Sequence, residues 1–134
     1  MADLLQLERD ESGVYTLTIR RPDVRNALNE QAFHQLISAC QIVRDDDEAR
    51  ALVLTGEGGA FSAGGDFESL QKMLDGDRDY AVSELENAGE GVLALPMLEV
   101  PTVAALNGDA FGGGAAVALS TDYRVMSDSA RLGF

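Results

Sequence analysis

The sequence has 134 residues, of which 46% are apolar, and a formal net charge of −13 at pH 7. This length is enough for one domain with a hydrophobic core, and the apolar content argues against an intrinsically disordered chain. A chain this acidic is poorly suited to binding nucleic acid or an anionic membrane surface.

Two strands are predicted at the start of the chain. Residues Leu4–Glu8 and Val14–Ile19 flank a polar segment that ends in a glycine, an arrangement typical of an antiparallel hairpin. In the second segment three apolar residues alternate with two threonines, which is the period of a half-buried strand.

A helix is predicted from Asn29, which can act as its N-cap, to about Arg44. The acidic run Asp45–Glu48 would be unfavourable at the negative end of a helix dipole, so it is predicted to be a solvated loop. His34 falls on the polar side of this helix. One apolar face is formed by Ala32, Phe33, Leu36, Ile37, Cys40 and Val43.

The middle of the chain predicts one strand and two helices. Residues Ala51–Thr55 lack polar alternation and should form a strand buried on both faces. The loop Gly56–Gly65 follows, and Asp66 can cap a short helix that reaches Met73. Residues Tyr80–Leu98 predict a longer helix, whose apolar face comprises Val82, Leu85, Ala88, Val92 and Leu95.

The last third predicts a buried strand at Val103–Leu106, a small-residue helix at Gly113–Leu119 and a strand at Tyr123–Met126. Strands that alternate with helices imply parallel pairing and a layered α/β fold.

Two glycine-rich turns stand out. Gly112–Gly114 follows a buried strand and opens a helix, and Phe61–Asp66 follows another strand. Unpaired backbone N–H groups in such turns can hold an anion or a developing oxyanion. We therefore expect the two turns to face each other across one site.

Glycine-rich turns also occur for purely structural reasons and in other classes of binding site. The triplet Gly112–Gly114 could be a tight turn that allows close packing between helix and strand. No Gly-Lys-Ser/Thr follows either turn, and Gly-x-Gly-x-x-Gly is not satisfied, so neither a P-loop nor a dinucleotide fingerprint is present. Ser62 has Ala60 where a nucleophile elbow needs glycine.

Three motifs in order carry a resemblance to a known family. They are Arg21–Asn29, Ala60–Asp66 and Pro101–Gly108 with the triplet Gly112–Gly114 after it. On these the chain resembles the crotonase (enoyl-CoA hydratase/isomerase) superfamily over nearly its whole length. The resemblance implies an α/β fold of the ββα type, with stacked and mostly parallel strands and helices. Residues 1–134 would be the N-terminal part of a single acyl-CoA-binding domain, with the C-terminal helical part missing.

The resemblance also implies a site. The thioester oxygen of an acyl-CoA would bind between the N–H groups of Gly65 and Gly113, and Arg25 would meet a phosphate of coenzyme A. The CoA thioester would be the substrate, with no further cofactor and no metal. The other positions that match the family's CoA contacts are Ala27, Ala63, Gly64 and Asp66, of which Asp66 is better explained as a helix cap than as an acid.

The sequence departs from the hydratase pattern. Two residues after the glycine triplet hydratases carry a catalytic Glu, but this chain has Ala116. Isomerisation of a double bond, which needs one carboxylate, is therefore favoured over hydration. The family's second carboxylate would come shortly after Phe134. Asp109 and Glu68 lie near the expected site and could supply an acid or base.

The expected partner is an acyl-CoA, with no nucleic acid and no membrane, and the resemblance implies a homo-oligomer, a trimer or hexamer. One cysteine, no signal-peptide pattern and no long apolar run favour the cytoplasm. A rival hypothesis is a non-catalytic CoA-binding or assembly fragment that lacks the general base.

Overall fold

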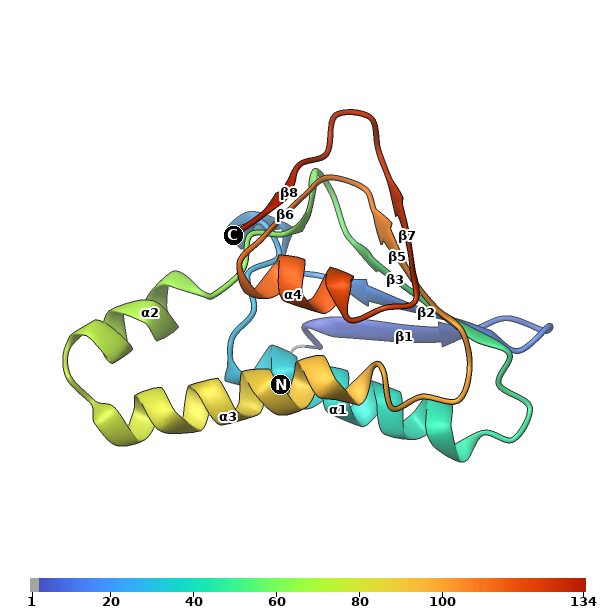
Figure 1. Ribbon diagram of the computed structural model, residues 1–134, viewed down its shortest axis with the longest axis horizontal. Coiled ribbons are helices and arrows are strands. Elements are labelled where there is room, and N and C mark those ends of the chain that lie inside the picture. The colour runs from blue at the N-terminus through green and yellow to red at the C-terminus, as the bar shows by residue number, and fades with distance from the viewer. Residues whose placement is uncertain (1–2) are drawn as a thin grey trace.

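The computed structural model describes residues 3–134 and arranges them in two β-sheets and four α-helices (Figure 1). The larger sheet has the strand order β1-β2-β3-β5-β7. Its strands are β1 (Leu5–Arg9), β2 (Val14–Ile19), β3 (Ala51–Gly56), β5 (Thr102–Leu106) and β7 (Tyr123–Met126).

The pairing of this sheet confirms the predicted hairpin and the predicted parallel fold. Strands β1 and β2 are antiparallel, with Leu5 opposite Ile19. All other neighbours in the larger sheet are parallel. Every second residue of β2 is buried, as the alternation predicted. In β3 only every second residue is fully buried, so the prediction of burial on both faces is wrong. One face of β3 packs in the main core, and the other remains half-buried.

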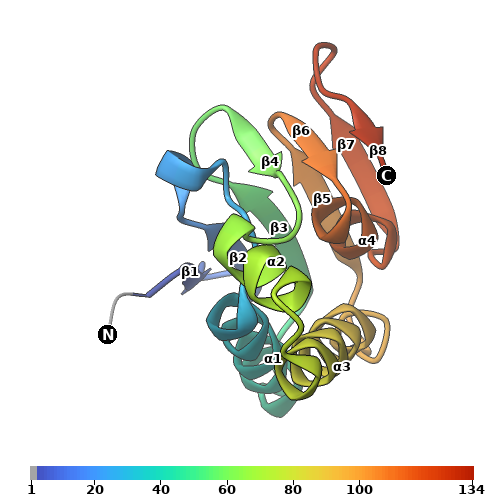
Figure 2. The ribbon, with the colours of Figure 1, turned by 90° about the vertical axis from the view of Figure 1, so that its left-hand side faces the viewer.

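A smaller parallel sheet, with the order β4-β6-β8, was not predicted. Its strands have only two or three residues each: β4 (Ala60–Ser62), β6 (Asp109–Phe111) and β8 (Leu132–Gly133). Figure 2 shows these strands beside β3, β5 and β7 of the larger sheet. Segments this short cannot display an alternating pattern, which is why the sequence predicts only a loop for residues 56–65 although they contain a strand.

The helices are α1 (Glu30–Asp45), α2 (Phe67–Leu74), α3 (Arg78–Ala94) and α4 (Gly113–Leu119), with a 3-10 turn η1 at Pro22–Val24. The Asn29 side chain accepts a hydrogen bond from the Ala32 N–H at 2.9 Å, which confirms the predicted N-cap of α1. Helices α1 and α3 lie side by side below the larger sheet (Figure 1). The predicted positions of His34 on the exposed side of α1 and of Cys40 in the core are also confirmed.

The predicted apolar face of α3 is wrong in its first half. Val82 and Leu85 are 47% and 63% exposed, whereas Glu84 and Gly91 are the buried residues of the helix. The first half of α3 extends beyond the sheet and meets α2 instead (Figure 1). Only the second half, where Gly91 lies against the Phe33 ring, packs closely on α1.

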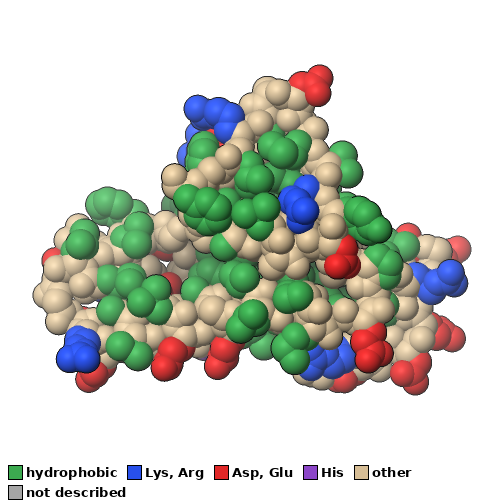
Figure 3. All heavy atoms as spheres, in the orientation of Figure 1, with side chains coloured by type: hydrophobic (Ala, Val, Ile, Leu, Met, Phe, Trp, Pro, Cys, Tyr) green, Lys and Arg blue, Asp and Glu red, His purple; other side chains and the backbone are tan. Residues whose placement is uncertain are grey.

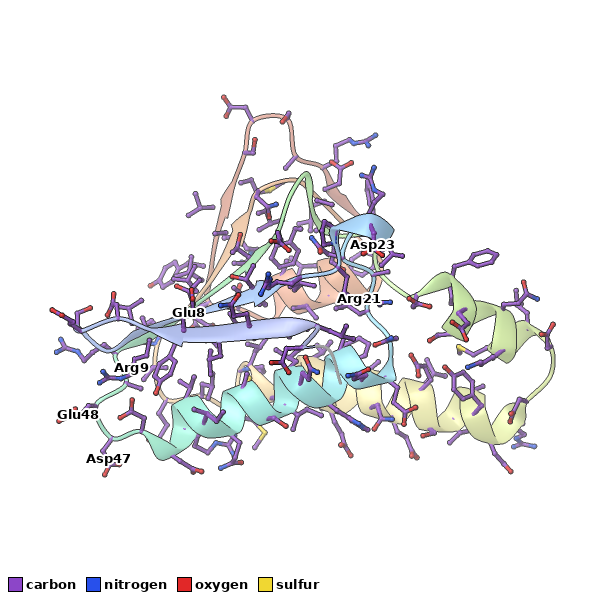
Figure 4. All side chains as sticks on the ribbon, turned by 180° about the vertical axis from the view of Figure 1, so that it is seen from behind. Glu8, Arg9, Arg21, Asp23, Asp47 and Glu48 are labelled. Atoms are coloured by element: carbon purple, nitrogen blue, oxygen red, sulfur yellow. The ribbon has the colours of Figure 1, made fainter. Side chains whose placement is uncertain are left out.

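The acidic run after α1 is only partly a solvated loop. Asp46 accepts hydrogen bonds from the Tyr15 hydroxyl at 2.7 Å and from Arg9 Nε at 2.9 Å. Its neighbours Asp47 and Glu48 are exposed. Figure 4 shows Glu8, Arg9, Asp47 and Glu48 at one end of the molecule, away from Arg21 and Asp23 beside η1. This charged cluster therefore lies apart from the predicted site.

Apolar side chains are exposed around α4 and the last two strands. All four residues of β7 are exposed, and Figure 3 shows hydrophobic side chains gathered over α4 and the strands beside it. None of the helices within residues 3–134 combines the length and the apolar character needed to cross a bilayer. The exposed side chains here include Leu119, Tyr123, Val125, Met126, Leu132 and Phe134.

A buried carboxyl lies where α2 meets α3. Glu84 is 7% exposed, and its Oε2 has no hydrogen-bond partner within the described residues. Burial raises the pKa of Glu84, and the charges of Glu30 and Asp66 act in the same direction, whereas the nearby Ser69 and Tyr80 hydroxyls act against it. The Tyr80 hydroxyl donates to Ser69 Oγ at 3.0 Å and links the two helices.

This burial predicts a pH-dependent stability. Because the pKa of Glu84 is higher in the folded chain, folding favours its protonated form, and stability falls as pH rises from the ordinary Glu pKa through the raised one. We expect Glu84→Gln to stabilise the protein at pH 7 by about 1 kcal/mol and to flatten this decline. Urea unfolding between pH 4 and 8 measures both, with the exposed Glu86→Gln as the control. A loss of stability in Glu84→Gln at every pH would contradict the interpretation.

Candidate functional site

The two glycine-rich turns face each other, as the sequence predicted. A Cβ atom built on Gly64 would lie 2.6 Å from the Phe111 carbonyl oxygen and 3.3 Å from the Gly113 nitrogen. A Cβ atom on Gly113 would in turn lie 4.0 Å from the Gly65 nitrogen. The backbones of the two turns are therefore in contact, and only residues without a side chain allow the approach at Gly64.

The first of these turns is held in place by residues 25–28, which run alongside it. The Leu28 N–H donates to the Gly64 carbonyl at 2.7 Å, and the Asp66 N–H donates to the Leu28 carbonyl at 3.0 Å. The Ala63 N–H donates to the Arg25 carbonyl at 2.9 Å. These bonds bring together all five residues that the family resemblance assigned to CoA binding, namely Arg25, Ala27, Ala63, Gly64 and Asp66.

Two backbone donors remain available between the turns. Within residues 3–134 the N–H groups of Gly65 and Gly113 donate to no protein acceptor. A Cβ atom on Gly65 would come no closer than 3.5 Å to any other residue, and one on Gly113 no closer than 3.9 Å. Contacts within the chain therefore do not require glycine at either position.

The other two glycines of the triplet have structural explanations. Gly112 has φ +51°, in the left-handed region that favours glycine. A Cβ atom on Gly114 would lie 2.5 Å from the Ser62 carbonyl oxygen, so α4 can pack on β4 only with glycine there. Close packing of helix and strand thus accounts for Gly114 but not for Gly113.

A cleft of about 570 Å³ opens beside the first turn. Figure 4 shows two of the residues that line it, Arg21 directly before η1 and Asp23 within η1. Gly64, Gly113 and Asp109 do not line this cleft. Its lining residues are Arg21, Asp23, Val24, Arg25, Ala27, Ala63, Gly65, Asp66, Phe67 and Glu68.

Asp66 forms the wall between this cleft and α2. Its Oδ1 accepts hydrogen bonds from the N–H groups of Glu68 and Ser69 at 3.0 and 3.4 Å, which confirms the predicted N-cap. Its Oδ2 pairs with Arg21 Nη2 at 2.9 Å, and both side chains are largely buried. Arg21 also donates to the Ala27 carbonyl at 2.6 Å. Sequence reasoning missed this role of Arg21, because Asp66 is distant in the chain.

A buried asparagine, also missed, shapes the loop before β4. Asn26 is fully buried, and its Nδ2 donates to the carbonyls of Glu57 and Ala60 at 2.9 and 2.7 Å. Its Oδ1 accepts from the Arg21 N–H at 2.9 Å. Asn107 donates to the same Ala60 carbonyl at 3.1 Å. The only sequence signal was that both asparagines fall within the matched motifs.

Arg25 and Asp109 lie close to each other at the start of β6, the central strand of the smaller sheet. Arg25 Nη2 is 3.7 Å from Asp109 Oδ2, and the Arg25 side chain is 63% exposed. Arg131 contacts the same carboxylate oxygen at 2.6 Å. Hydrogen bonds from the Arg131 side chain and backbone lower the pKa of Asp109, which makes this carboxylate a weak base.

The other candidate carboxylate, Glu68, lies on the exposed side of α2. Its side chain is largely exposed and pairs with Lys72 at 3.4 Å. Helix α4 contains only glycine, alanine, valine and leucine, so Ala116 has no titratable neighbour within its helix. In the part of the chain from residue 3 onward, no three His, Cys, Asp or Glu side chains are grouped to hold a metal ion.

Comparison with solved structures places this arrangement among known folds. The chain is similar to an enoyl-CoA hydratase of Mycobacterium smegmatis, with a TM-score of 0.91 and 33% sequence identity. The match covers 98% of this chain and 50% of that protein.

Sequence comparison gives the same result. The chain is 35% identical to a short-chain-enoyl-CoA hydratase of Clostridium acetobutylicum, over 92% of this chain and 46% of that protein. It is 31% identical to a trans-2-decenoyl-[acyl-carrier-protein] isomerase of Streptococcus mutans, over 90% of this chain and 46% of that protein. The chain thus spans about half the length of these relatives. The family model for enoyl-CoA hydratase/isomerase matches residues 9–134, and the chain therefore belongs to the enoyl-CoA hydratase/isomerase family.

Proposed function

We propose that this protein is an acyl-CoA enzyme that stabilises a thioester enolate between two backbone N–H groups. The observation that carries the proposal is the pair of N–H groups of Gly65 and Gly113, which adjoin each other and have no acceptor within residues 3–134. Donors held at the position where negative charge develops lower the barrier to enolate formation, because they need no reorganisation during the reaction.

The cleft beside Gly65 would take the coenzyme. Arg25 would bind a phosphate of CoA, and its exposed guanidinium supports this assignment. The backbones of Ala27, Ala63 and Gly64 would line the path of the coenzyme toward the two donors. Asp66 would contribute by holding Arg21 and the start of α2 rather than by transferring a proton.

Isomerisation is the chemistry that these residues favour. A base would take a proton from the carbon beside the thioester carbonyl of a 3-enoyl chain, the charge would spread onto the oxygen, and the proton would return two carbons further on. Hydration would need a second carboxylate, and the matching position is Ala116. The base expected shortly after Phe134 stays a prediction, and Asp109 and Glu68 are the weaker candidates.

A direct test uses a 3-oxoacyl-CoA, whose enolate absorbs in the near ultraviolet. We expect saturable binding to the full chain with an increase in enolate absorbance, because the two N–H groups favour the anionic oxygen. Free CoA should bind without the absorbance change. Binding with no change in absorbance would refute the enolate-stabilising role, and no binding at all would refute the proposed function.

Arg25 provides the prediction for the phosphate contact. Arg25→Gln should weaken binding of the CoA thioester about five-fold, the range expected for one exposed ion pair. The matched pantetheine thioester, which lacks the nucleotide phosphates, should bind both forms equally. Arg20→Gln is the control, because Arg20 is also exposed and pairs with Glu57 at 3.5 Å outside the cleft lining. Equal CoA affinities in Arg25→Gln and wild type would contradict the assignment.

The second candidate function is a non-catalytic CoA-binding or assembly fragment. The exposed residues of β7 favour it, since exposed apolar patches mark interaction sites. Analytical sedimentation of the full chain would distinguish the two, because a monomer that binds no apolar dye argues against an assembly role. We also retain as proposals a homo-oligomer, a trimer or hexamer, and a cytoplasmic location.

A further inference from the structure

One carboxylate, that of Asp109 at the start of the central strand of the smaller sheet, is shared by two arginines. We propose that Arg131 is a positioning residue that neutralises Asp109 and so leaves the Arg25 guanidinium free to bind a phosphate of CoA. This inference rests on the proposed function, in which Arg25 is the phosphate ligand, and it adds a residue that touches neither the phosphate nor the reacting atoms.

Asp109 is bound tightly by Arg131. The Arg131 N–H and Nε contact Oδ1 at 2.9 and 3.3 Å, and Nη2 contacts Oδ2 at 2.6 Å. The parallel register of β6 and β8, with Ala110 opposite Leu132, places the two residues side by side. The guanidinium also lies over the Phe111 ring, 5.5 Å from its centre. These contacts define one orientation of the Asp109 carboxylate, which is only 12% exposed.

Arg25 is held much more loosely by the same carboxylate. Its Nη2 lies 3.7 Å from Asp109 Oδ2, beyond hydrogen-bond distance, and within residues 3–134 its guanidinium makes no hydrogen bond. The Arg25 backbone, in contrast, is fixed by its N–H bond to the Pro22 carbonyl at 3.1 Å and by its own carbonyl, which accepts from Ala63. The backbone therefore holds Arg25 at the cleft, while its guanidinium donates to no acceptor within residues 3–134.

The balance of charge explains why Arg131 matters to Arg25. Two guanidinium groups around one carboxylate leave one positive charge unbalanced, and Arg25 is the one whose guanidinium donates no hydrogen bond within residues 3–134. Without Arg131, Asp109 would be an unpaired carboxylate beside Arg25. It would then draw the guanidinium into a direct ion pair and would also repel an incoming phosphate. The phosphate would have to compete with a carboxylate of this chain.

The experiment compares full-length variants by titration with CoA and with pantetheine. Arg131→Gln should weaken CoA binding by up to about five-fold, as Arg25→Gln does, and leave pantetheine binding unchanged, whereas Arg131→Lys, which keeps the charge, should remain close to wild type. Asp109→Asn combined with Arg131→Gln should restore CoA binding to within about two-fold of wild type, because the competing charge is gone. Thermal unfolding of each variant identifies any that fail to fold.

The outcomes separate this inference from the proposed function. Unchanged CoA binding in a folded Arg131→Gln overturns the inference alone, and so does a double variant that binds as weakly as Arg131→Gln. Equal weakening of CoA and pantetheine would show a general structural role for Arg131 and would also overturn it. Absence of CoA binding by the wild type overturns the proposed function and this inference together.

Discussion

Replacing Gly113 with alanine is expected to leave the fold intact and to weaken enolate binding on the order of 100-fold, because a methyl group that keeps the thioester oxygen away from the Gly113 N–H costs about as much as the loss of one oxyanion donor. The added methyl group would have no neighbour closer than 3.9 Å, and alanine is a better helix former than glycine at the start of α4. The same methyl group would lie 4.0 Å from the Gly65 nitrogen, beside the space between the two donors. The methyl group would therefore clash with the bound thioester and not with other residues of the protein.

The matched control is the same substitution one residue later. In Gly114→Ala the methyl group would lie 2.5 to 2.7 Å from three atoms of the buried Ser62. Strand β4 cannot move away easily, since it pairs with β6 and its Ser62 Oγ accepts from the Gly64 N–H at 3.2 Å. We expect a loss of stability of about 3 kcal/mol from overpacking.

Two measurements distinguish the paired variants. Urea unfolding should show wild-type or higher stability for Gly113→Ala and a large decrease for Gly114→Ala. Titration with a 3-oxoacyl-CoA, followed by near-ultraviolet absorbance, should show the loss of enolate binding in Gly113→Ala. If Gly113→Ala bound the enolate as well as the wild type, the thioester oxygen could not lie between the two N–H groups.

Substitution of Asn26 by alanine is expected to destabilise the protein by about 4 kcal/mol, the second large effect. The change removes three hydrogen bonds from a fully buried side chain and leaves the Glu57 carbonyl and the Arg21 N–H without that partner. In addition, Asn26 has φ +58°, a left-handed conformation that costs alanine about 1 kcal/mol. The loop between β3 and β4 would then be held by Asn107 without Asn26.

Asn26→Gly separates the two contributions. Glycine adopts the left-handed conformation readily, so this variant should be about 1 kcal/mol more stable than Asn26→Ala while lacking the same hydrogen bonds. Ser38→Ala, on the exposed side of α1, serves as the surface control. Chemical denaturation gives all three values, and an Asn26→Ala free energy within about 0.5 kcal/mol of wild type, the usual scatter for surface changes, would contradict this account.

The predicted elements that proved correct depend on local chemistry. The hairpin follows from alternation in Val14–Ile19, and the starts of α1 and α2 follow from the caps Asn29 and Asp66, whose side chains bond to N–H groups within three residues. The prediction for α3 was wrong where the helix leaves the core, because a periodic pattern cannot say which part of a helix has a neighbour.

The candidate site was likewise predicted where its residues are close in sequence and missed where they are distant. The sequence predicted both glycine-rich turns and predicted that they face each other. It could do so because glycines are visible in the sequence and fall in motifs of a fixed order. The parts that were missed are pairs distant in the sequence: Arg21 with Asp66, and Arg131 with Asp109. In the sequence each of these arginines has several acidic residues as possible partners. The actual partner is decided by which short strands and turns lie next to each other in the fold.

The sequence by itself determined the family resemblance, the order of the four helices and of the five strands of the larger sheet, and the position of Gly65 and Gly113 as the backbone donors to test. The tertiary structure alone decided that the smaller sheet exists, that Gly114 rather than Gly113 is required for packing, and that Asp109 is occupied by Arg131. The physical reason is that caps and alternation act within a few residues. Short strands and ion pairs, in contrast, form only when the fold brings distant segments together.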